Sequence, residues 1–359
     1  MKIAITTSQV PFIRGGAELM TEGLLHNLRA RGHQVEIISI PFIFHNKKHI
    51  KNSMDYWERQ NFNGFDVGEV DMVICLKFPT YYLKHHNKVV WLMHQHRSVY
   101  ELWDTNYGDV SSDKEACLLR EDIMRRDTKH INESTRIFTI SKTVGSRLKK
   151  YNNIDSQHIY QPSPISDLLG PGEQHPYIFC PSRLEDIKRQ ELLIRAVSHC
   201  KTDCNILISG EGGIKGKLQE LIEKFNLNHR VELLGHVSQS ELASLYRNAL
   251  AVYFAPIGED YGFVTLEAMQ SAKPIITCSD SGGPLEFVLD GKTGFVVDPD
   301  AKIVAGKIDF LFSNKKVAKE MGLNAYEHYK NLNINWGNVV DQLIEGEHDC
   351  PNKDGDINI

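Results

Sequence analysis

The amino-acid sequence predicts a two-domain α/β protein in which each domain is a doubly wound, Rossmann-like parallel sheet. Three observations support this fold class. The 359 residues suit two domains, at the usual allowance of about 150 residues each. Short apolar runs alternate with helical patterns in both halves, an order that builds parallel sheets. The alternation is interrupted at the Pro- and Gly-rich stretch QPSPISDLLGPGEQHP (161–176), which we take as the domain boundary.

The first half opens with a β-α-β unit. Residues 2–8 and 34–40 are short apolar runs, and between them Leu24 and Leu28 have helical spacing ahead of a stop at Gly32. A strand, a helix and a second strand are therefore expected in this order.

Three further buried strands are expected in the first half, at 71–76, 88–93 and 136–141. Each is a continuous apolar run, which is typical of parallel strands covered on both faces. A charged helix is expected over 113–133. The segment 41–62 mixes Lys, His and aromatic residues. We expect it to be a solvated loop, with contact to an acceptor or a membrane surface as the alternative.

The second half repeats the alternation. Its strands are expected at 177–182, 205–210, 231–235, 251–256, 274–278 and 294–298. Its helices are expected near 188–199, 214–225, 239–249 and 263–271. Two such domains in tandem leave a cleft between them, where the carboxyl ends of both sets of strands can converge on one ligand.

We therefore divide the chain into four parts. Residues 1–165 form the N-terminal domain and residues 166–335 the C-terminal domain. A closing helix over 336–348 could cross back to the first domain. The tail at 349–359 is predicted to be disordered.

Composition and charge exclude several classes of protein. The opening MKIAITTSQV turns polar too quickly for a signal peptide, and no apolar run reaches the ~18 residues that span a bilayer, so we expect a cytoplasmic protein. The net charge of −5 argues against a nucleic-acid partner. Residues 1–165 hold 22 Lys and Arg against 18 Asp and Glu (+4), and the remainder 19 against 28 (−9). This asymmetry indicates a solvated surface or a first half that faces an anionic partner or membrane.

Two common nucleotide-binding motifs are excluded. GEGGIKGK (210–217) resembles a phosphate loop, but five residues instead of four separate Gly210 from Gly216. Leu218 also stands where a Ser or Thr would bind magnesium. The first β-α turn, VPFIRGGAELM, lacks the G-x-G-x-x-G of NAD-binding turns.

Two pairs of residues near expected strand ends could bind phosphate. Gly15 and Gly16 precede a helix, where two glycines let a ligand approach the backbone and the helix-terminal amides. A plain tight turn would explain them equally well. Arg183 and Lys188, in RLEDIK, follow a strand at the mouth of the expected cleft and could hold a diphosphate without a metal. A solvated helix start is the alternative.

The stretch GEDYGFVTLEAM (258–269) places two glutamates, Glu259 and Glu267, eight residues apart around the start of a helix. The amides of residues 261–263 would be unsatisfied at that helix terminus and could bind an anion. Carboxylates do not bind phosphate, but they accept hydrogen bonds from vicinal hydroxyls. The pair therefore predicts a site for sugar and ribose beside a phosphate. A helix cap with a solvated glutamate is the structural alternative.

The chain resembles the family 4 glycosyltransferases, which have the GT-B fold. The motifs that carry the resemblance are EDYGFVTLE with its Glu-x7-Glu spacing, SAKPIITCSDSGGPLEFVLDGKTGFVVDP, RLEDIK, LLGHVSQSELASLYRNA and the N-terminal GGAE. The resemblance covers nearly the whole chain and is densest from about 178 to 300. It implies two Rossmann-like domains facing across a cleft, of which residues 1–165 would bind the acceptor and residues 166–335 the nucleotide-diphosphate sugar donor. It also implies retention of anomeric configuration, no cofactor and no metal.

The resemblance further implies a role for each quoted residue. Glu267 would bind the ribose hydroxyls, and Glu259 the hydroxyls of the donor sugar. Arg183 and Lys188 would neutralise the diphosphate as charge develops on the leaving group. The remaining donor-binding residues are expected to be Gly15, Gly16, Gly235, His236, Asp260, Tyr261, Gly262 and Phe263.

The segment WLMHQHRSVYELWD supplies the first-domain candidates. His94 directly follows a strand and is expected beside the donor sugar, where it would hydrogen-bond the sugar or stabilise positive charge on it. Gln95 and His96 are expected to contact the acceptor. The nucleotide base would lie against the backbone near Gly235 and His236. No nucleophile is evident, so we expect attack from the leaving-group face, with the diphosphate accepting the acceptor's proton.

The expected acceptor is a saccharide or a glycolipid, met through peripheral contact with the inner face of the membrane. A sugar-nucleotide epimerase on the same fold is one alternative, against which the Glu-x7-Glu spacing argues. A metal-dependent GT-A transferase is another: DPD (298–300) matches its DxD motif but reads as a turn. The third is an inactive nucleotide-sugar-binding scaffold subunit of a polysaccharide assembly complex, which the complete set of charged site residues disfavours.

Overall fold

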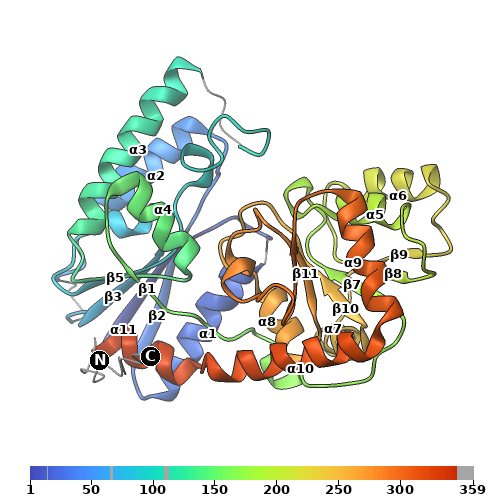
Figure 1. Ribbon diagram of the computed structural model, residues 1–359. Helices are drawn as coiled ribbons and strands as arrows, with labels where there is room; N and C mark the ends of the chain where they lie inside the picture. The colour runs from blue at the N-terminus through green and yellow to red at the C-terminus, as the bar shows by residue number, and fades with distance from the viewer. Residues whose placement is uncertain (14, 65–67, 109–112, 346–359) are drawn as a thin grey trace, which may run out of the picture.

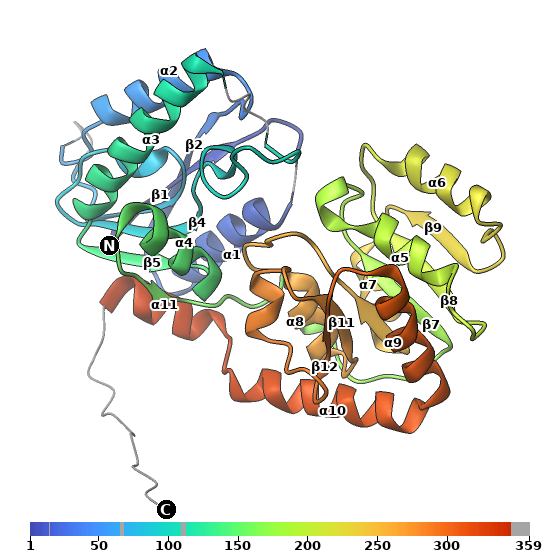
Figure 2. The same ribbon diagram turned by 45° about the horizontal axis from the view of Figure 1, so that its top comes forward.

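The computed structural model describes residues 1–13, 15–64, 68–108 and 113–345. They form two six-stranded parallel sheets with helices on both faces, which confirms the predicted fold class (Figure 1, Figure 2). The predicted tail at 349–359 and the last residues of the expected closing helix lie outside the described residues. No described helix is both long enough and apolar enough to cross a membrane.

The first sheet has the strand order β2-β1-β3-β4-β5-β6. Its strands are β1 (Lys2–Gln9), β2 (Gln34–Pro41), β3 (Met72–Lys77), β4 (Lys88–His94), β5 (Arg136–Thr139) and β6 (Gln157–His158). Its helices are α1 (Gly16–Ala30), α2 (Lys47–Arg59), α3 (Lys114–Asn132) and α4 (Lys142–Asn152), with 3₁₀ turns η1 (Thr80–Tyr82) and η2 (Arg97–Val99). Every residue of β3 is buried, as its continuous apolar run predicts.

The second sheet has the order β12-β11-β10-β7-β8-β9. Its strands are β7 (Tyr177–Pro181), β8 (Asn205–Ser209), β9 (Val231–Gly235), β10 (Ala251–Tyr253), β11 (Ile275–Cys278) and β12 (Gly294–Val297). Its helices are α5 (Gln190–Val197), α6 (Lys215–Lys224), α7 (Gln239–Asn248), α8 (Phe263–Gln270), α9 (Ala301–Ser313) and α10 (Lys315–Asn331). Three 3₁₀ turns are η3 (Ser166–Leu168), η4 (Asp186–Lys188) and η5 (Gly283–Glu286). Helix α5 packs against α6 and α9, and helix α8 packs against α7 and α10.

Helix α11 (Trp336–Glu345) returns to the first domain after α10 (Figure 1). It packs against α1, where Arg31 forms an ion pair with Asp341. The Trp336 ring meets the Trp91 ring edge-on, with centroids 6.4 Å apart. The chain therefore crosses between the domains twice, before β7 and before α11.

The segment 41–62 is not the solvated loop that we expected, because most of it forms α2. Ile50, Met54 and Trp57 follow the i, i+4, i+7 spacing of a helix face and are fully buried against the first domain. The charged residues between them occupy the outer face and obscure this pattern in the sequence.

Helix α4 was not expected either. It buries only Val144, Leu148 and Asn152, so its apolar stripe is short. The Ser141 hydroxyl caps it by accepting a hydrogen bond from the Val144 amide at 3.1 Å. This helix lies against the second domain, and its contacts bear on the site described next.

Candidate functional site

A cavity of about 450 Å³ lies between the two domains, at the carboxyl ends of both sets of strands. Its volume is in the range of small-molecule sites. The first domain and the connecting segment line it with Val10, Ile13, Gly15, Gly16, Ala17, Glu18, Met20, Phe44, Lys77, Met93, His94, His96, Arg97, Ser98, Leu102, Ile140 and Gln161. The second domain lines it with Arg183, Lys188, Glu259, Asp260, Tyr261, Gly262 and Phe263.

Lys188 and Glu259 form the polar centre of the second-domain wall. The Lys188 Nζ lies 2.5 Å from Glu259 Oε2, and the two side chains are only 12% and 20% exposed. Arg183 lies nearer the mouth, where its 55% exposed side chain pairs with Glu185 at 2.8 Å. Two cations and the Glu259 carboxylate thus lie on one wall, a combination suited to a diphosphate joined to a polyhydroxylated group.

The glycines of SDSGGPLE hold the backbone of Glu259. Gly283 N donates to Glu259 O at 2.8 Å, and Glu259 N donates to Ser281 O at 2.8 Å. Gly282 adopts φ +74°, and a Cβ there would lie 2.5 Å from Glu259 O. Only glycine fits this close approach without moving the loop.

The N-terminus of α8 faces the same cavity. Its N-cap is Gly262, at φ +86°, which offers no side chain to the first-turn amides. The amides of Phe263 and Val264 have no acceptor among the described residues. These free donors, together with the helix dipole, suit a bound anion.

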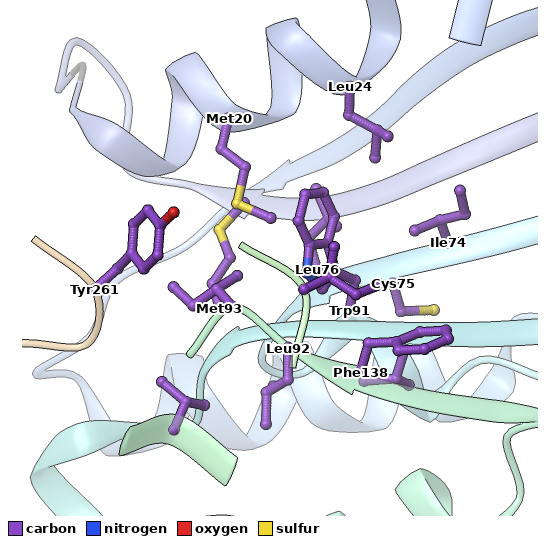
Figure 3. Packing of buried hydrophobic residues seen from close by; sticks show 14 of the residues in the cluster. Met20, Leu24, Ile74, Cys75, Leu76, Trp91, Leu92, Met93, Phe138 and Tyr261 are labelled. Carbon is purple, nitrogen blue, oxygen red and sulfur yellow. The ribbon is translucent and has the colours of Figure 1, made fainter. Parts of the chain in front are cut away.

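Tyr261 and Phe263 join the two domains beside the cavity. Figure 3 shows Tyr261 of the second domain beside Met20 and Met93 of the first. The Tyr261 hydroxyl donates to Gln161 O at 2.6 Å. A Cβ on Gly16 would lie 3.2 Å from the Phe263 ring, so Gly16 permits close approach of the second domain.

His94 ends β4 and lines the cavity opposite Glu259 and Lys188. Its Nδ1 lies 2.7 Å from Gln95 O. Burial lowers the pKa of the imidazole, and Lys77 and Arg97 add to this effect against the opposing influence of Asp260. The ring is therefore neutral at pH 7.

The two residues after His94 are oriented differently. Gln95 is outside the cavity lining, and its Nε2 donates to Asn152 Oδ1 at 2.7 Å in the interior of the first domain. His96 touches the cavity but is 1% exposed, with Nε2 at 3.0 Å from Phe44 O. Burial lowers the pKa of His96 to about 4. Both side chains are thus engaged within the first domain, which sequence spacing could not show.

Three predicted donor-binding residues are outside the cavity lining. Glu267 is buried in α8, where its carboxylate accepts hydrogen bonds from Ser163 Oγ at 2.6 Å and Tyr246 OH at 2.5 Å. Burial raises the pKa of Glu267, although both hydroxyls act in the opposite direction. Gly235 and His236 lie at the carboxyl end of β9, the edge strand of the second sheet.

Sequence reasoning missed an ion pair on the first-domain wall. Lys77, at the end of β3, has its Nζ 3.3 Å from Glu18 Oε1 and donates to Ser8 O at 3.2 Å. Glu18 Oε2 in turn accepts a hydrogen bond from the Gly15 amide at 2.9 Å. The position of Lys77 at the carboxyl end of a buried strand, and of Glu18 in GGAE, could have indicated both.

Two arginines of the first domain were also missed. Arg147, on α4, forms an ion pair with the Asp260 carboxylate, and Arg97 Nη1 lies 3.7 Å from it. Burial raises the pKa of Asp260, but the two guanidinium groups outweigh this effect and hold it below its ordinary value. Asp260 is thus a charged residue of the domain interface at the edge of the cavity.

The DPD sequence at 298–300 is engaged in local structure. Asp300 caps α9 by accepting hydrogen bonds from the Lys302 and Ile303 amides at 2.8 and 3.0 Å. Asp298 accepts from the Ser279 hydroxyl at 3.2 Å. In the part of the chain that the structure describes, no three His, Cys, Asp or Glu side chains gather as metal ligands would.

Comparison with known proteins relates this geometry to a family. Residues 165–328 match the family described as Glycosyl transferases group 1. The chain is 22% identical over 389 residues to an uncharacterized glycosyltransferase of Methanocaldococcus jannaschii, covering 96% of this chain and 97% of that protein.

Two solved structures share the fold. Sucrose-phosphate synthase from Thermosynechococcus elongatus superposes with a TM-score of 0.76 at 16% identity, over 95% of this chain and 97% of that one. HepE of Anabaena, in complex with UDP and glucose, superposes with a TM-score of 0.66 at 16% identity, over 92% and 95%.

Proposed function

Through residues 165–328 the chain belongs to the Glycosyl transferases group 1 family, and from this premise we propose the finer features of its reaction. It is a retaining glycosyltransferase that moves a hexose-type sugar from a nucleotide-diphosphate sugar to a hydroxyl of a saccharide or lipid-linked saccharide, without a metal. The observation that carries this proposal is the convergence of Arg183, Lys188, Glu259 and the α8 terminus on one cavity wall, with His94 opposite.

The residues of the second-domain wall suggest separate roles in binding the diphosphate and the sugar. We expect Arg183, Lys188 and the free α8 amides to bind the diphosphate and to stabilise the charge that develops on it as the bond to the sugar breaks. Glu259 is the carboxylate available for the sugar hydroxyls. In HepE of Anabaena, UDP and glucose are the molecules bound, which supports a nucleoside diphosphate and a sugar as ligands here.

The reaction requires one bond exchange at the anomeric carbon. The bond from this carbon to the diphosphate oxygen breaks, and a bond to the acceptor oxygen forms on the same face. The acceptor's proton passes to the departing diphosphate. His94 would accept a hydrogen bond from the sugar through Nε2, because its Nδ1 is committed to Gln95 O.

Exposed apolar residues of the first domain near the cavity support the proposal that the acceptor is lipid-linked and is met at a membrane surface. Phe12, Ile13 and Ile43 follow the ends of β1 and β2 near the cavity and are exposed, Phe12 completely. Large apolar side chains exposed beside a site are typical of surfaces that contact apolar ligands or membranes. A saccharide hydroxyl at the headgroup end would then reach the cavity.

Calorimetry with a panel of UDP-, GDP- and ADP-sugars in EDTA tests the proposal. We expect one donor to bind and to be hydrolysed slowly, and Lys188→Met to weaken its binding by roughly tenfold or more, since one charged hydrogen bond is lost. Arg195→Met is the matched control, because Arg195 is an exposed α5 residue paired with Glu191 at 2.6 Å. Binding of a donor without turnover with any acceptor would favour the scaffold alternative, and binding of none would contradict the site assignment.

A further inference from the structure

Two first-domain arginines hold the loop that carries Glu259. Arg97 Nη2 and Arg147 Nη2 each donate to the carbonyl of Gly258 at 2.7 Å. Arg147 also pairs with the carboxylate of Asp260. The first domain therefore binds the loop on both sides of Glu259, at the carbonyl of Gly258 and at the carboxylate of Asp260.

The same loop is bound on its other side by its own domain. Gly258 N donates to Asp280 O at 2.9 Å, and Glu259 N donates to Ser281 O at 2.8 Å. Ser141, at the start of α4 in the first domain, donates its hydroxyl to Asp260 O at 2.5 Å. Glu259 thus stands between hydrogen bonds from both domains, and the first-domain set exists only when the domains are together.

Glu101 holds the two guanidinium groups side by side. Its carboxylate lies 2.5 Å from Arg97 Nε and 3.0 Å from Arg147 Nη1. The Arg97 and Arg147 side chains are 20% and 15% exposed. Because Glu101 offsets the repulsion between two close cations, the pair is preorganised within the first domain to receive the loop.

A second contact docks the same helix independently. Glu286 of the second domain accepts hydrogen bonds from the amides of Lys142 and Thr143 at 2.9 and 2.7 Å. These are first-turn amides of α4, which a carboxylate stabilises. Helix α4 is therefore fixed to the second domain at its N-terminus by Glu286 and one turn later by Arg147.

We propose that Arg97 and Arg147 are positioning residues, which set the geometry of Glu259 for the donor sugar only when the two domains are closed. We call Arg97, Arg147, the Gly258 carbonyl and the Asp260 carboxylate the latch. Its geometry is a property of the structure and does not depend on which reaction the protein catalyses. The consequence for the sugar rests on the proposed function. The residues proposed to bind the nucleoside diphosphate, Arg183, Lys188 and the first turn of α8, are not members of the latch.

The variant Arg147→Met tests the latch, with Lys149→Met as the matched control. Lys149 lies on the same helix, pairs with Asp155 at 2.8 Å and is 49% exposed, so its loss removes one charge from α4 without touching the interface. Small-angle X-ray scattering without ligand should show a larger radius of gyration for Arg147→Met than for the control. Arg147→Lys, which keeps the charge but not the fork that bridges two acceptors, serves if the methionine variant does not fold.

Kinetics then separate positioning from a general loss of structure. We expect Arg147→Met to lower the turnover number for donor hydrolysis by roughly 10- to 100-fold, because a misplaced group near the reaction costs this much. The Kd for the nucleoside diphosphate, with UDP, GDP and ADP as probes, should stay within about twofold of the wild type.

The outcomes distinguish this inference from the proposed function. Unchanged scattering and unchanged turnover in both Arg147 variants would overturn the latch. Loss of nucleoside diphosphate binding together with turnover would also overturn it, because the effect would not be confined to the sugar. If no nucleotide binds the wild type, the proposed function fails, while the scattering comparison still decides whether Arg147 holds the domains together.

Discussion

A single hydrogen bond decides which nitrogen of His94 can act in the cavity. Because Nδ1 faces a carbonyl oxygen, which only accepts, Nδ1 must carry the proton of the neutral ring. The lone pair is then on Nε2. Burial lowers the pKa of the ring, so protonation, which removes this lone pair, begins only below the ordinary value of about 6.5.

Turnover should therefore be independent of His94 protonation above pH ~6.5 and should fall at lower pH as Nε2 gains a proton. His94→Gln is expected to lower turnover roughly tenfold, the value of one hydrogen bond, and to remove this acidic decline. Turnover measured from pH 5 to 8 for both proteins checks the expectation. An identical acidic decline in the variant would assign the titration to another group.

At the scale of secondary-structure elements, the turn after β11 controls the loop after β10. Gly282→Ala should destabilise the protein by ~1–3 kcal/mol, because the new Cβ would meet the carbonyl of Glu259 and the residue would keep a positive φ. Gly306→Ala in α9 is the control: a Cβ there meets nothing within 4 Å, so it should be neutral or stabilise by up to about 1 kcal/mol. Denaturant unfolding measures both. Equal midpoints would contradict the role given to Gly282.

The predicted elements differ in how well local sequence defines them. The central strands are continuous apolar runs, and the bounds of β3 and β4 lie within one residue of the predicted 71–76 and 88–93. Helix α4 buries too few apolar residues to be recognised. Helices α9 and α10 lie between the last predicted strand, 294–298, and the predicted closing helix, 336–348, where no helix was expected. Helix propensity alone is too weak to reveal such helices.

The candidate site divides in the same way. Glu259 and Lys188 lie on loops whose motifs are local, so the sequence indicated both. Arg97 and Arg147 donate hydrogen bonds to the carbonyl of Gly258, which lies 161 and 111 residues away in the sequence. The local sequence around each arginine does not indicate this partner. The hydrogen bonds from Ser163 and Tyr246 to the buried Glu267 likewise depend on the tertiary structure and could not be predicted from the local sequence.

At the scale of the whole molecule, α11 attaches the far end of the described chain to the first domain. Leu343 of α11 is fully buried, whereas Leu323 of α10 is 46% exposed. We expect Leu343→Ala to cost about 2–5 kcal/mol of unfolding free energy and Leu323→Ala less than about 0.5 kcal/mol. Thermal unfolding compares the two variants directly. Similar melting temperatures would mean that the docking of α11 contributes little.

The return of α11 also sets how the molecule carries a mechanical load. A force applied between Lys2 in β1 and Glu345 in α11 enters and leaves through the same domain, because α11 packs on α1. The contact between α11 and the first domain, which includes Trp336 and the Arg31–Asp341 ion pair, is the first to resist this force. The second domain carries no force until α11 separates from the first domain. A single-molecule pulling trace should therefore begin with one short extension, and only then should force reach the second sheet.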